Sequence, residues 1–142
     1  MRYSEVDLQI EDIMWFGIDV QGHIIAFTSG GYGCVPEFVC RSKEETQKIE
    51  NFFMNELQRS TSGKLLLADN GSKLTKDAIL LAEKGVFSYD VSKDGSRYNK
   101  IAVPKRPLNL NLLPKRIQNV IRDHKVDTNA EKSKYVIVEH AY

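Results

Sequence analysis

Apolar and polar residues alternate in the first segment of the chain. Between Ser4 and Asp12, the side chains of Val6, Leu8 and Ile10 are separated by acidic or amide side chains. A period of two is typical of a strand with one buried face. We therefore expect an edge strand here, or an ordered arm.

The pattern that follows predicts a β-hairpin and then a shaped loop. Met14–Asp19 and His23–Thr28 are rich in bulky and β-branched residues, and Val20-Gln21-Gly22 between them is a turn sequence. Neither side of the second segment is strongly polar, so both faces of this strand are expected to be covered. Ser29–Pro36 then supplies three glycines and a proline, which favour a loop held close to other backbone and prevent an immediate helix.

Three later segments have the period and the end signals of helices. With the residue that starts each, they are Lys43 to about Leu57 after Ser42, Lys76–Lys84 after Thr75, and Lys115 to about His124 after Pro114. Glu45 completes a capping-box pattern with Ser42. Gly85 is the expected stop of the second helix, and proline suits the first turn of the third.

The remaining apolar runs predict strands. Leu65-Leu66-Leu67 is a short apolar run that indicates a buried strand. Val86–Val91 and Arg97–Val103 flank an Asp-Gly turn and predict a second hairpin. Lys105–Leu113 should be extended because prolines interrupt this part of the chain, and Tyr135–Glu139 is expected to be a final strand.

These elements predict one α+β domain. The expected sheet is mainly antiparallel, built from the two hairpins plus the C-terminal strand, with about three helices packed on it. The chain has 142 residues, of which 42% are hydrophobic and 27% charged, and this is the size and balance of a single domain over residues 1–142. A chain of this length can bury enough surface to fold without disulfides or metal ions.

The sequence predicts a cytoplasmic protein. Its first residues are acidic and polar, unlike a signal or transit peptide, and no apolar run approaches the roughly 20 residues that span a bilayer. Cys34 and Cys40 are therefore expected to be reduced.

Charge is unevenly distributed, although the formal net charge is only +1. Residues 1–60 carry ten acidic and five basic side chains, whereas residues 97–125 carry eight basic side chains and one acidic one. The eight are Arg97, Lys100, Lys105, Arg106, Lys115, Arg116, Arg122 and Lys125. Such runs are usually solvated faces, but a basic region with Tyr98 interleaved is the basis of one hypothesis, nucleic-acid binding. The near-zero net charge is not that of a typical phosphate binder.

A second hypothesis is an enzyme. Cys34 in the glycine-rich loop and His23 on the preceding strand are the residue types of a thiolate–imidazole pair, with Cys34 as nucleophile. A small buried thiol is the commoner situation. Cys34 and Cys40 lack the spacing of zinc ligands, so no metal site or other cofactor is predicted. The Gly-Gly-Tyr-Gly segment is not followed by Lys-Ser or Lys-Thr and does not open a helix, which excludes a Walker-type nucleotide site.

A third hypothesis, a protein-binding module, comes from a family resemblance. Trp15–Asp19, His23–Gly31 and Val35–Phe38, followed by a capped helix, resemble small bacterial immunity proteins of polymorphic toxin systems. The chain does not carry the Pro-x-x-Tyr and Asn-Gly-Gly pattern of the SUKH immunity superfamily. The resemblance implies a non-enzymatic cytoplasmic protein that binds one toxin domain and blocks its active site.

This implication draws attention to the acidic residues near the first hairpin. Against a basic nuclease, carboxylates can mimic phosphate and accelerate encounter by electrostatic steering. The residues that we assign to a partner-binding surface are Glu5, Asp7, Glu11, Asp12 and Asp19, with Tyr32 from the glycine-rich loop. The alternative interpretation is that these acids only keep an edge strand from pairing with other chains.

Overall fold

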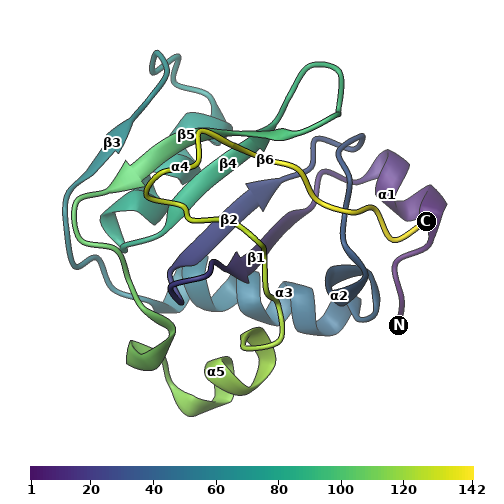
Figure 1. Ribbon diagram of the computed structural model, residues 1–142, viewed down its shortest axis with the longest axis horizontal. Helices are drawn as coiled ribbons and strands as arrows, with labels where there is room; N and C mark the ends of the chain where they lie inside the picture. The colour runs from purple at the N-terminus through teal and green to yellow at the C-terminus, as the bar shows by residue number, and fades with distance from the viewer.

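A computed structural model describes residues 1–142 as an α+β chain built on one mixed sheet (Figure 1). The strands, in their order across the sheet, are β1 (Met14–Ile18), β2 (Ile24–Thr28), β4 (Phe87–Val91), β5 (Tyr98–Pro104) and β3 (Gly63–Leu65), and β6 (Tyr135–Val136) also pairs with β5. The helices are α1 (Glu5–Ile10), α2 (Glu37–Cys40), α3 (Lys43–Asn51), α4 (Lys73–Glu83) and α5 (Lys115–Ile121). A π-helical segment, η1 (Phe52–Glu56), continues α3, and a 3-10 turn, η2 (Leu110–Leu112), precedes α5.

The predicted fold class and both predicted hairpins are confirmed. β1 pairs with β2, and β4 pairs with β5, in antiparallel register. The two hairpins join through β2 and β4, which run parallel, with Ile25 opposite Phe87. Parallel neighbours need a long crossover, and here the crossover contains α2, α3 and α4.

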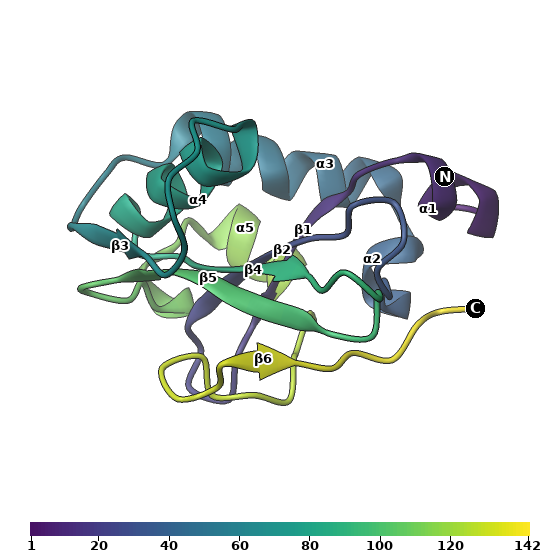
Figure 2. The same ribbon diagram turned by 90° about the horizontal axis from the view of Figure 1, so that it is seen from above.

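Both faces of the sheet are covered, as the apolar character of β2 predicted. Figure 2 shows α3, α4 and α5 on one side of the sheet and the C-terminal segment with β6 on the other. Ile24 and Ala26 pack toward the helices in a cluster with Phe53 of η1. Ile25 and Phe27 point the opposite way, into a cluster that includes residues of α1, α2 and the C-terminal segment.

The segment that was predicted to be an edge strand or arm is helix α1. Ser4 forms a capping box with Asp7, because the Ser4 hydroxyl accepts the Asp7 N–H and the Asp7 carboxylate accepts the Ser4 N–H. Of the alternating apolar residues, only Leu8 is buried, while Val6 and Ile10 are exposed. The prediction was wrong because a local cap, together with one buried anchor, outweighs a short alternating pattern.

Other element ends also differ from expectation. Ser72, three residues before the predicted cap Thr75, is the N-cap of α4. Leu65 ends the short edge strand β3, and Leu66 and Leu67 are exposed, so the predicted buried strand is wrong. The helix expected from Lys43 to about Leu57 is α-helical only as far as Asn51. It then continues as the π-helical segment η1.

The η1 segment is stabilised by a buried lysine from α4's C-terminal end. Lys84 Nζ donates hydrogen bonds to the backbone carbonyl oxygens of Phe53 at 2.7 Å and Met54 at 2.9 Å. Carbonyls released by irregular helical geometry need another donor, and the lysine provides it. Burial lowers the pKa of Lys84.

The helices are short. None of them has the length and the apolar character that crossing a bilayer would require. Cys34 and Cys40 are both free thiols.

Candidate functional site

Five of the six predicted partner-binding residues lie on or beside α1. Glu5 and Asp7 belong to the helix, and Glu11 and Asp12 follow it directly. The glycine-rich loop that carries Tyr32 folds against the same place. The N–H of Gly30 donates to Asp12 Oδ1 at 2.8 Å, and a Cβ on Gly31 would lie 3.4 Å from the carbonyl oxygen of Gln9.

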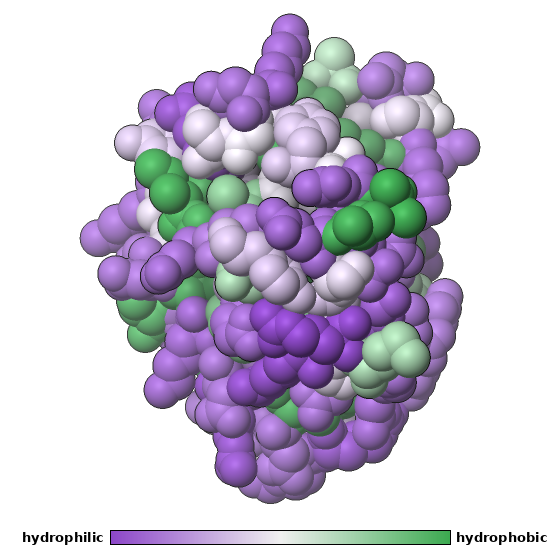
Figure 3. Space-filling model, turned by 90° about the vertical axis from the view of Figure 1, so that its right-hand side faces the viewer, coloured by the Kyte–Doolittle hydropathy of each residue, from purple (hydrophilic) through white to green (hydrophobic).

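Exposed apolar side chains lie among these acids. Val6 is 62% exposed, Ile10 75% and Tyr32 56%. Val6 and Ile10 are four residues apart on α1 and therefore share one face of the helix. Figure 3 views the side of the molecule on which α1 lies and shows separate apolar patches on a mostly hydrophilic surface. We refer to Val6, Ile10 and Tyr32, together with Glu5, Glu11 and Asp12, as the α1 surface.

Asp7 stands at the border of this surface with a structural role. Its carboxylate caps α1 and also forms an ion pair with Lys43 Nζ at 3.0 Å. The hydrogen bond from the Ser4 N–H, and then the bond with Lys43, lower the pKa of Asp7. Because these contacts engage its oxygens, Asp7 has less capacity than Glu5 or Glu11 to form hydrogen bonds or ion pairs with a partner.

Asp19 is not part of the α1 surface. Its side chain is buried at the β1–β2 turn, where its oxygens accept backbone N–H groups of Gln21, His23 and Ala130, each at 2.9 Å. A carboxylate with three backbone donors in a buried position supports the fold. The sequence offered no sign of this, because Ala130 lies far away along the chain.

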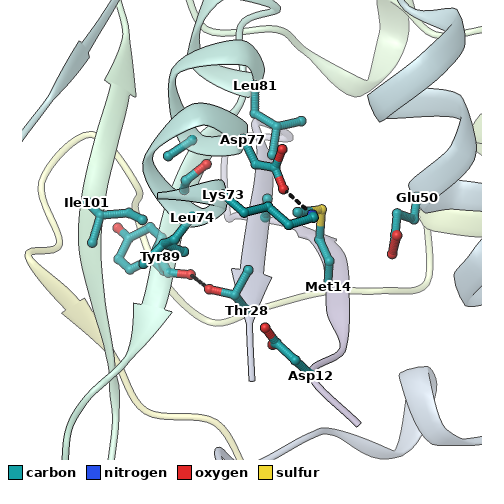
Figure 4. Close-up of a pocket in the computed structure, with 13 residues that line it drawn as sticks. Asp12, Met14, Thr28, Glu50, Lys73, Leu74, Asp77, Leu81, Tyr89 and Ile101 are labelled. Carbon is teal, nitrogen blue, oxygen red and sulfur yellow. Dashed lines mark hydrogen bonds and ion pairs between the residues drawn. The ribbon is translucent and has the colours of Figure 1, made fainter. Parts of the chain in front are cut away.

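A cavity of about 140 Å³ opens between the sheet and helices α3 and α4, and Asp12 of the α1 surface stands at it (Figure 4). Its residues are Asp12, Met14, Ala26, Thr28, Glu50, Lys73, Leu74, Asp77, Ala78, Leu81, Ser88, Tyr89 and Ile101. Small side chains explain why space remains here: Ser88 lies opposite Ala26 on one neighbouring strand and opposite Ala102 on the other. We refer to this space as the acidic cavity.

One ion pair and one unpaired carboxylate give the acidic cavity its charge. Lys73 Nζ lies 2.6 Å from Asp77 Oδ2, one helical turn along α4. Glu50 of α3 is half-buried and has neither an ion pair nor a hydrogen bond. Burial raises the pKa of Glu50; Lys73 opposes that shift, while Asp77 and Asp12 add to it.

A second carboxyl group lies close to the acidic cavity on β4. Thr28 Oγ1 donates a hydrogen bond to Asp90 Oδ1 at 2.6 Å. Burial raises the pKa of Asp90, the Thr28 bond opposes the shift, and the nearby charge of Asp12 adds to it. The electrostatic influence of Asp12 thus reaches both Glu50 and Asp90.

The floor of the acidic cavity carries an unsatisfied hydroxyl. Ser88 is 5% exposed, and its Oγ has no hydrogen-bond partner. Phe87 and Tyr89 beside it pack into the cluster on the opposite face of the sheet, which leaves Ser88 on the helix side. A buried hydroxyl without a partner is costly, so a polar group in the cavity would stabilise it.

The structure does not bring His23 and Cys34 together. His23 precedes β2, where its Nδ1 lies 3.7 Å from Asp19 Oδ2 and 3.5 Å from Glu131 Oε1. Cys34 follows the other end of β2, and its carbonyl oxygen accepts a hydrogen bond from the Tyr98 hydroxyl at 2.6 Å. The strand between them, at about 3.3 Å per residue, spans roughly 17 Å. No three His, Cys, Asp or Glu side chains are arranged to hold a metal ion.

The predicted basic region is divided among several elements, and part of it is occupied. Arg97 lies over the ring of Tyr135 at 4.4 Å, and Arg116 pairs with Glu56 at 2.7 Å. Lys100 Nζ donates to a backbone carbonyl at 2.6 Å, and burial lowers its pKa. Figure 1 shows β5 and α5 well apart, at the top and bottom of the view. Three of the eight basic side chains, Arg97, Lys100 and Arg116, are thus engaged within the protein.

The α1 surface and the acidic cavity could not be predicted from the sequence, for different reasons. The exposed face of α1 was hidden by its alternating pattern, although Ser4 and Asp7 carried the signal of a helix start. The cavity joins Asp12, Glu50, Asp77 and Ser88, which no local motif connects. No family model, curated protein or solved structure matches the chain.

Proposed function

We propose that this chain is a non-enzymatic bacterial protein-binding domain, an immunity protein that binds a toxin domain in the cytoplasm and neutralises it. One observation carries the proposal: exposed Val6 and Ile10 lie on α1 among the acids Glu5, Glu11 and Asp12, and exposed Tyr32 lies in the loop whose Gly30 N–H donates to Asp12. Apolar and aromatic anchors surrounded by charged residues are the usual composition of a protein-recognition site.

The two kinds of side chain would act at different stages of binding. Carboxylates such as Glu11 and Asp12 attract a basic partner over several ångströms and increase the association rate, an effect that salt weakens. Ile10 and Tyr32 become buried only in the complex, and each aliphatic or aromatic side chain that leaves water contributes roughly 1.5–3 kcal/mol. Steering comes from the acids, and the lifetime of the complex from the apolar anchors.

The proposal is tested with the toxin-like protein encoded next to this chain in its host. Ile10→Asp should weaken binding by about 30-fold, which corresponds to about 2 kcal/mol. Leu112→Asp is the matched control, because Leu112 is also 75% exposed but lies in η2, away from α1. Isothermal titration calorimetry measures both variants beside the unchanged protein.

Two further measurements separate this proposal from other functions. Glu11→Gln should lower the association rate and make it less sensitive to salt, while leaving the dissociation rate nearly unchanged. Equal effects of Ile10→Asp and Leu112→Asp would contradict the assigned surface. Absence of toxin binding, combined with salt-sensitive binding of DNA or RNA, would contradict the proposed function itself.

A further inference from the structure

We propose that the acidic cavity binds a primary ammonium or guanidinium group carried on a short apolar stem. The inference rests on the cavity residues themselves and does not depend on the proposed toxin binding. Three features carry it: an unpaired carboxylate, an unsatisfied buried hydroxyl, and an apolar wall, all facing one space of about 140 Å³.

Charge selects the sign of the ligand. Lys73 pairs with Asp77 at 2.6 Å, whereas Glu50 and Asp12 form no ion pair of their own, although the charge of Lys73 acts on both. Asp12 uses Oδ1 to accept the Gly30 N–H, and Glu50 makes no hydrogen bond. Carboxylates in a partly dehydrated space repel an anionic ligand and attract a cation with N–H donors. Figure 4 shows Met14 between the carboxyl groups of Asp12 and Glu50, with the Lys73–Asp77 ion pair beside it.

The cavity floor and wall determine the rest of the ligand. Ser88 Oγ can accept an N–H or donate to a polar atom, and either bond would satisfy it. Leu74, Leu81 and Ile101 line the apolar side and would contact a short hydrocarbon stem. Both halves of an alkylammonium or alkylguanidinium group therefore have matching surroundings.

Volume limits the size of the ligand. Cavities near 150 Å³ hold a molecule of about six heavy atoms, such as benzene. A four-carbon amine fits this limit, whereas a nucleotide or a sugar phosphate does not. A bare metal ion does not fit the donor arrangement either, since no three candidate ligands converge.

The same chemical group could be supplied in two ways. One source is a free small amine or guanidine. The other is a lysine or arginine side chain of a protein partner, which Asp12 would admit because it belongs both to the α1 surface and to the acidic cavity. This second source rests on the proposed function, whereas the first does not.

The test is a titration of the isotope-labelled protein with n-butylamine and ethylguanidine, both of which are within this size limit, followed by backbone amide NMR shifts. We expect saturable shifts at Ser88, Glu50 and Asp77, with a Kd on the order of 1 mM for a ligand of this size. n-Butanol has the hydrocarbon stem of n-butylamine without the charge, and it should bind at least tenfold more weakly than n-butylamine. Absence of saturable shifts with both cations, or equal binding of n-butanol, would overturn the proposal.

Variants assign the binding to the proposed groups. Glu50→Gln removes the unpaired charge at constant size and should weaken n-butylamine binding at least tenfold. Ser88→Val fills the floor and should also weaken it. Glu139→Gln, outside the cavity, is the control and should leave the Kd unchanged. Glu50→Gln alone is sufficient if the valine variant does not fold, and an unchanged Kd in folded Glu50→Gln would overturn the proposal.

A further titration distinguishes a free amine from a lysine side chain as the source of the cation. The blocked peptide acetyl-Gly-Lys-Gly-amide presents a lysine side chain on a backbone. Tighter binding of this peptide than of n-butylamine supports a partner side chain, and the reverse order supports a free amine. Either order supports the cation site, and the calorimetric experiment with the toxin decides the proposed function separately.

Discussion

The carboxylate of Asp19 accepts a hydrogen bond from the backbone N–H of Ala130 at 2.9 Å. Its other oxygen accepts the N–H groups of Gln21 and His23. One buried side chain thus closes the β1–β2 turn and holds the C-terminal segment beside it. Nearby, Val20 N–H donates to the Thr128 carbonyl, which strengthens the same connection.

Asp19→Asn should lower the free energy of unfolding by about 3 kcal/mol. The amide keeps the size of the side chain, but its NH₂ group replaces an oxygen that faces a backbone donor, and a charge-assisted bond is lost. Urea denaturation measures the change. Asp123→Asn is the control, since Asp123 is exposed and makes no hydrogen bond, and it should change stability by less than about 0.5 kcal/mol. Equal losses in the two variants would contradict the structural role of Asp19.

Glycines at positions 63 and 71 are required for different reasons. A Cβ on Gly63 would overlap the Cβ of Ala82 and lie 3.0 Å from its carbonyl carbon, so β3 could not stay against α4. Gly71 has open space but a φ of +71°. Gly63→Ala should cost about 3 kcal/mol and Gly71→Ala about 1 kcal/mol.

Asparagine distinguishes the two causes. Asn tolerates the left-handed region, so Gly71→Asn should be milder than Gly71→Ala, whereas Gly63→Asn should be at least as damaging as Gly63→Ala. Thermal unfolding of the four variants gives the comparison. The opposite order at position 71 would show that backbone conformation is not what selects glycine there.

Ser72 rather than Thr75 should behave as the cap of α4. The Ser72 hydroxyl accepts the Thr75 N–H at 3.3 Å. Ser72→Ala should therefore lower the free energy of unfolding by about 1 kcal/mol, the usual loss for an N-cap. Ser62→Ala is the control, because Ser62 is exposed and its hydroxyl makes no hydrogen bond. A loss at Ser62 as large as that at Ser72 would contradict the assignment.

Stability should fall steeply in alkaline solution. Burial raises the pKa of Tyr3 from 10.0 to about 12, raises those of Tyr89 and Tyr98 further, and raises that of Cys40 from 9.0 to about 11. A raised pKa in the folded state means that stability is fully present below the unfolded value and is lost as pH rises toward the folded value. We therefore expect the free energy of unfolding to fall between pH 9 and pH 12.

The alkaline loss is measured by urea denaturation at a series of pH values. Each buried tyrosine or cysteine with a raised pKa lowers the free energy of unfolding by up to about 1.4 kcal/mol per pH unit in this range. Tyr89→Phe should therefore flatten the curve, because its hydroxyl no longer ionises. Lys84 and Lys100, whose pKa values burial lowers, act in the opposite direction, whereas the raised pKa values of Lys43 and Lys73 add to the loss. A curve that Tyr89→Phe leaves unchanged would contradict this account.

Glu50→Gln should stabilise the protein at pH 7. Burial raises the pKa of Glu50, so its ionised form is disfavoured in the folded chain. The stabilisation should be complete above the folded-state pKa and should vanish as pH falls below the ordinary value of 4.5, where Glu50 is neutral in both states. Thermal unfolding at pH 7 and pH 4 tests this. A stabilisation that persists at pH 4 would point to packing instead.

The prediction for Glu50 complements the inferred cation site. A residue whose charge weakens the empty fold but strengthens ligand binding is typical of a functional site. The same substitution is thus expected to raise stability and lower affinity for n-butylamine.

Elements set by neighbouring residues were predictable from the sequence. The turns at Gly22 and Gly95 have φ values of +81° and +75°, which glycine adopts without strain, and both hairpins lie where those turns indicated. The helix after Ser42 begins as predicted because Ser42 accepts the Glu45 N–H three residues on. Caps and turns depend on contacts within a few residues, and the sequence displays those directly.

Features that depend on distant residues were decided only by the tertiary structure. The α1 segment became a helix with Val6 and Ile10 exposed, since only Leu8 found a place in the core. Asp19 is not on the predicted surface, because its buried carboxylate accepts the Ala130 N–H at 2.9 Å. The acidic cavity exists because the crossover from β2 to β4 brings α3 and α4 over a row of small side chains. The sequence by itself determined where the hairpin turns, the Ser42 cap and most strands lie. Which side chains meet, and which remain free to bind, required the packed chain, because burial and charge at each site come from residues far apart in the sequence.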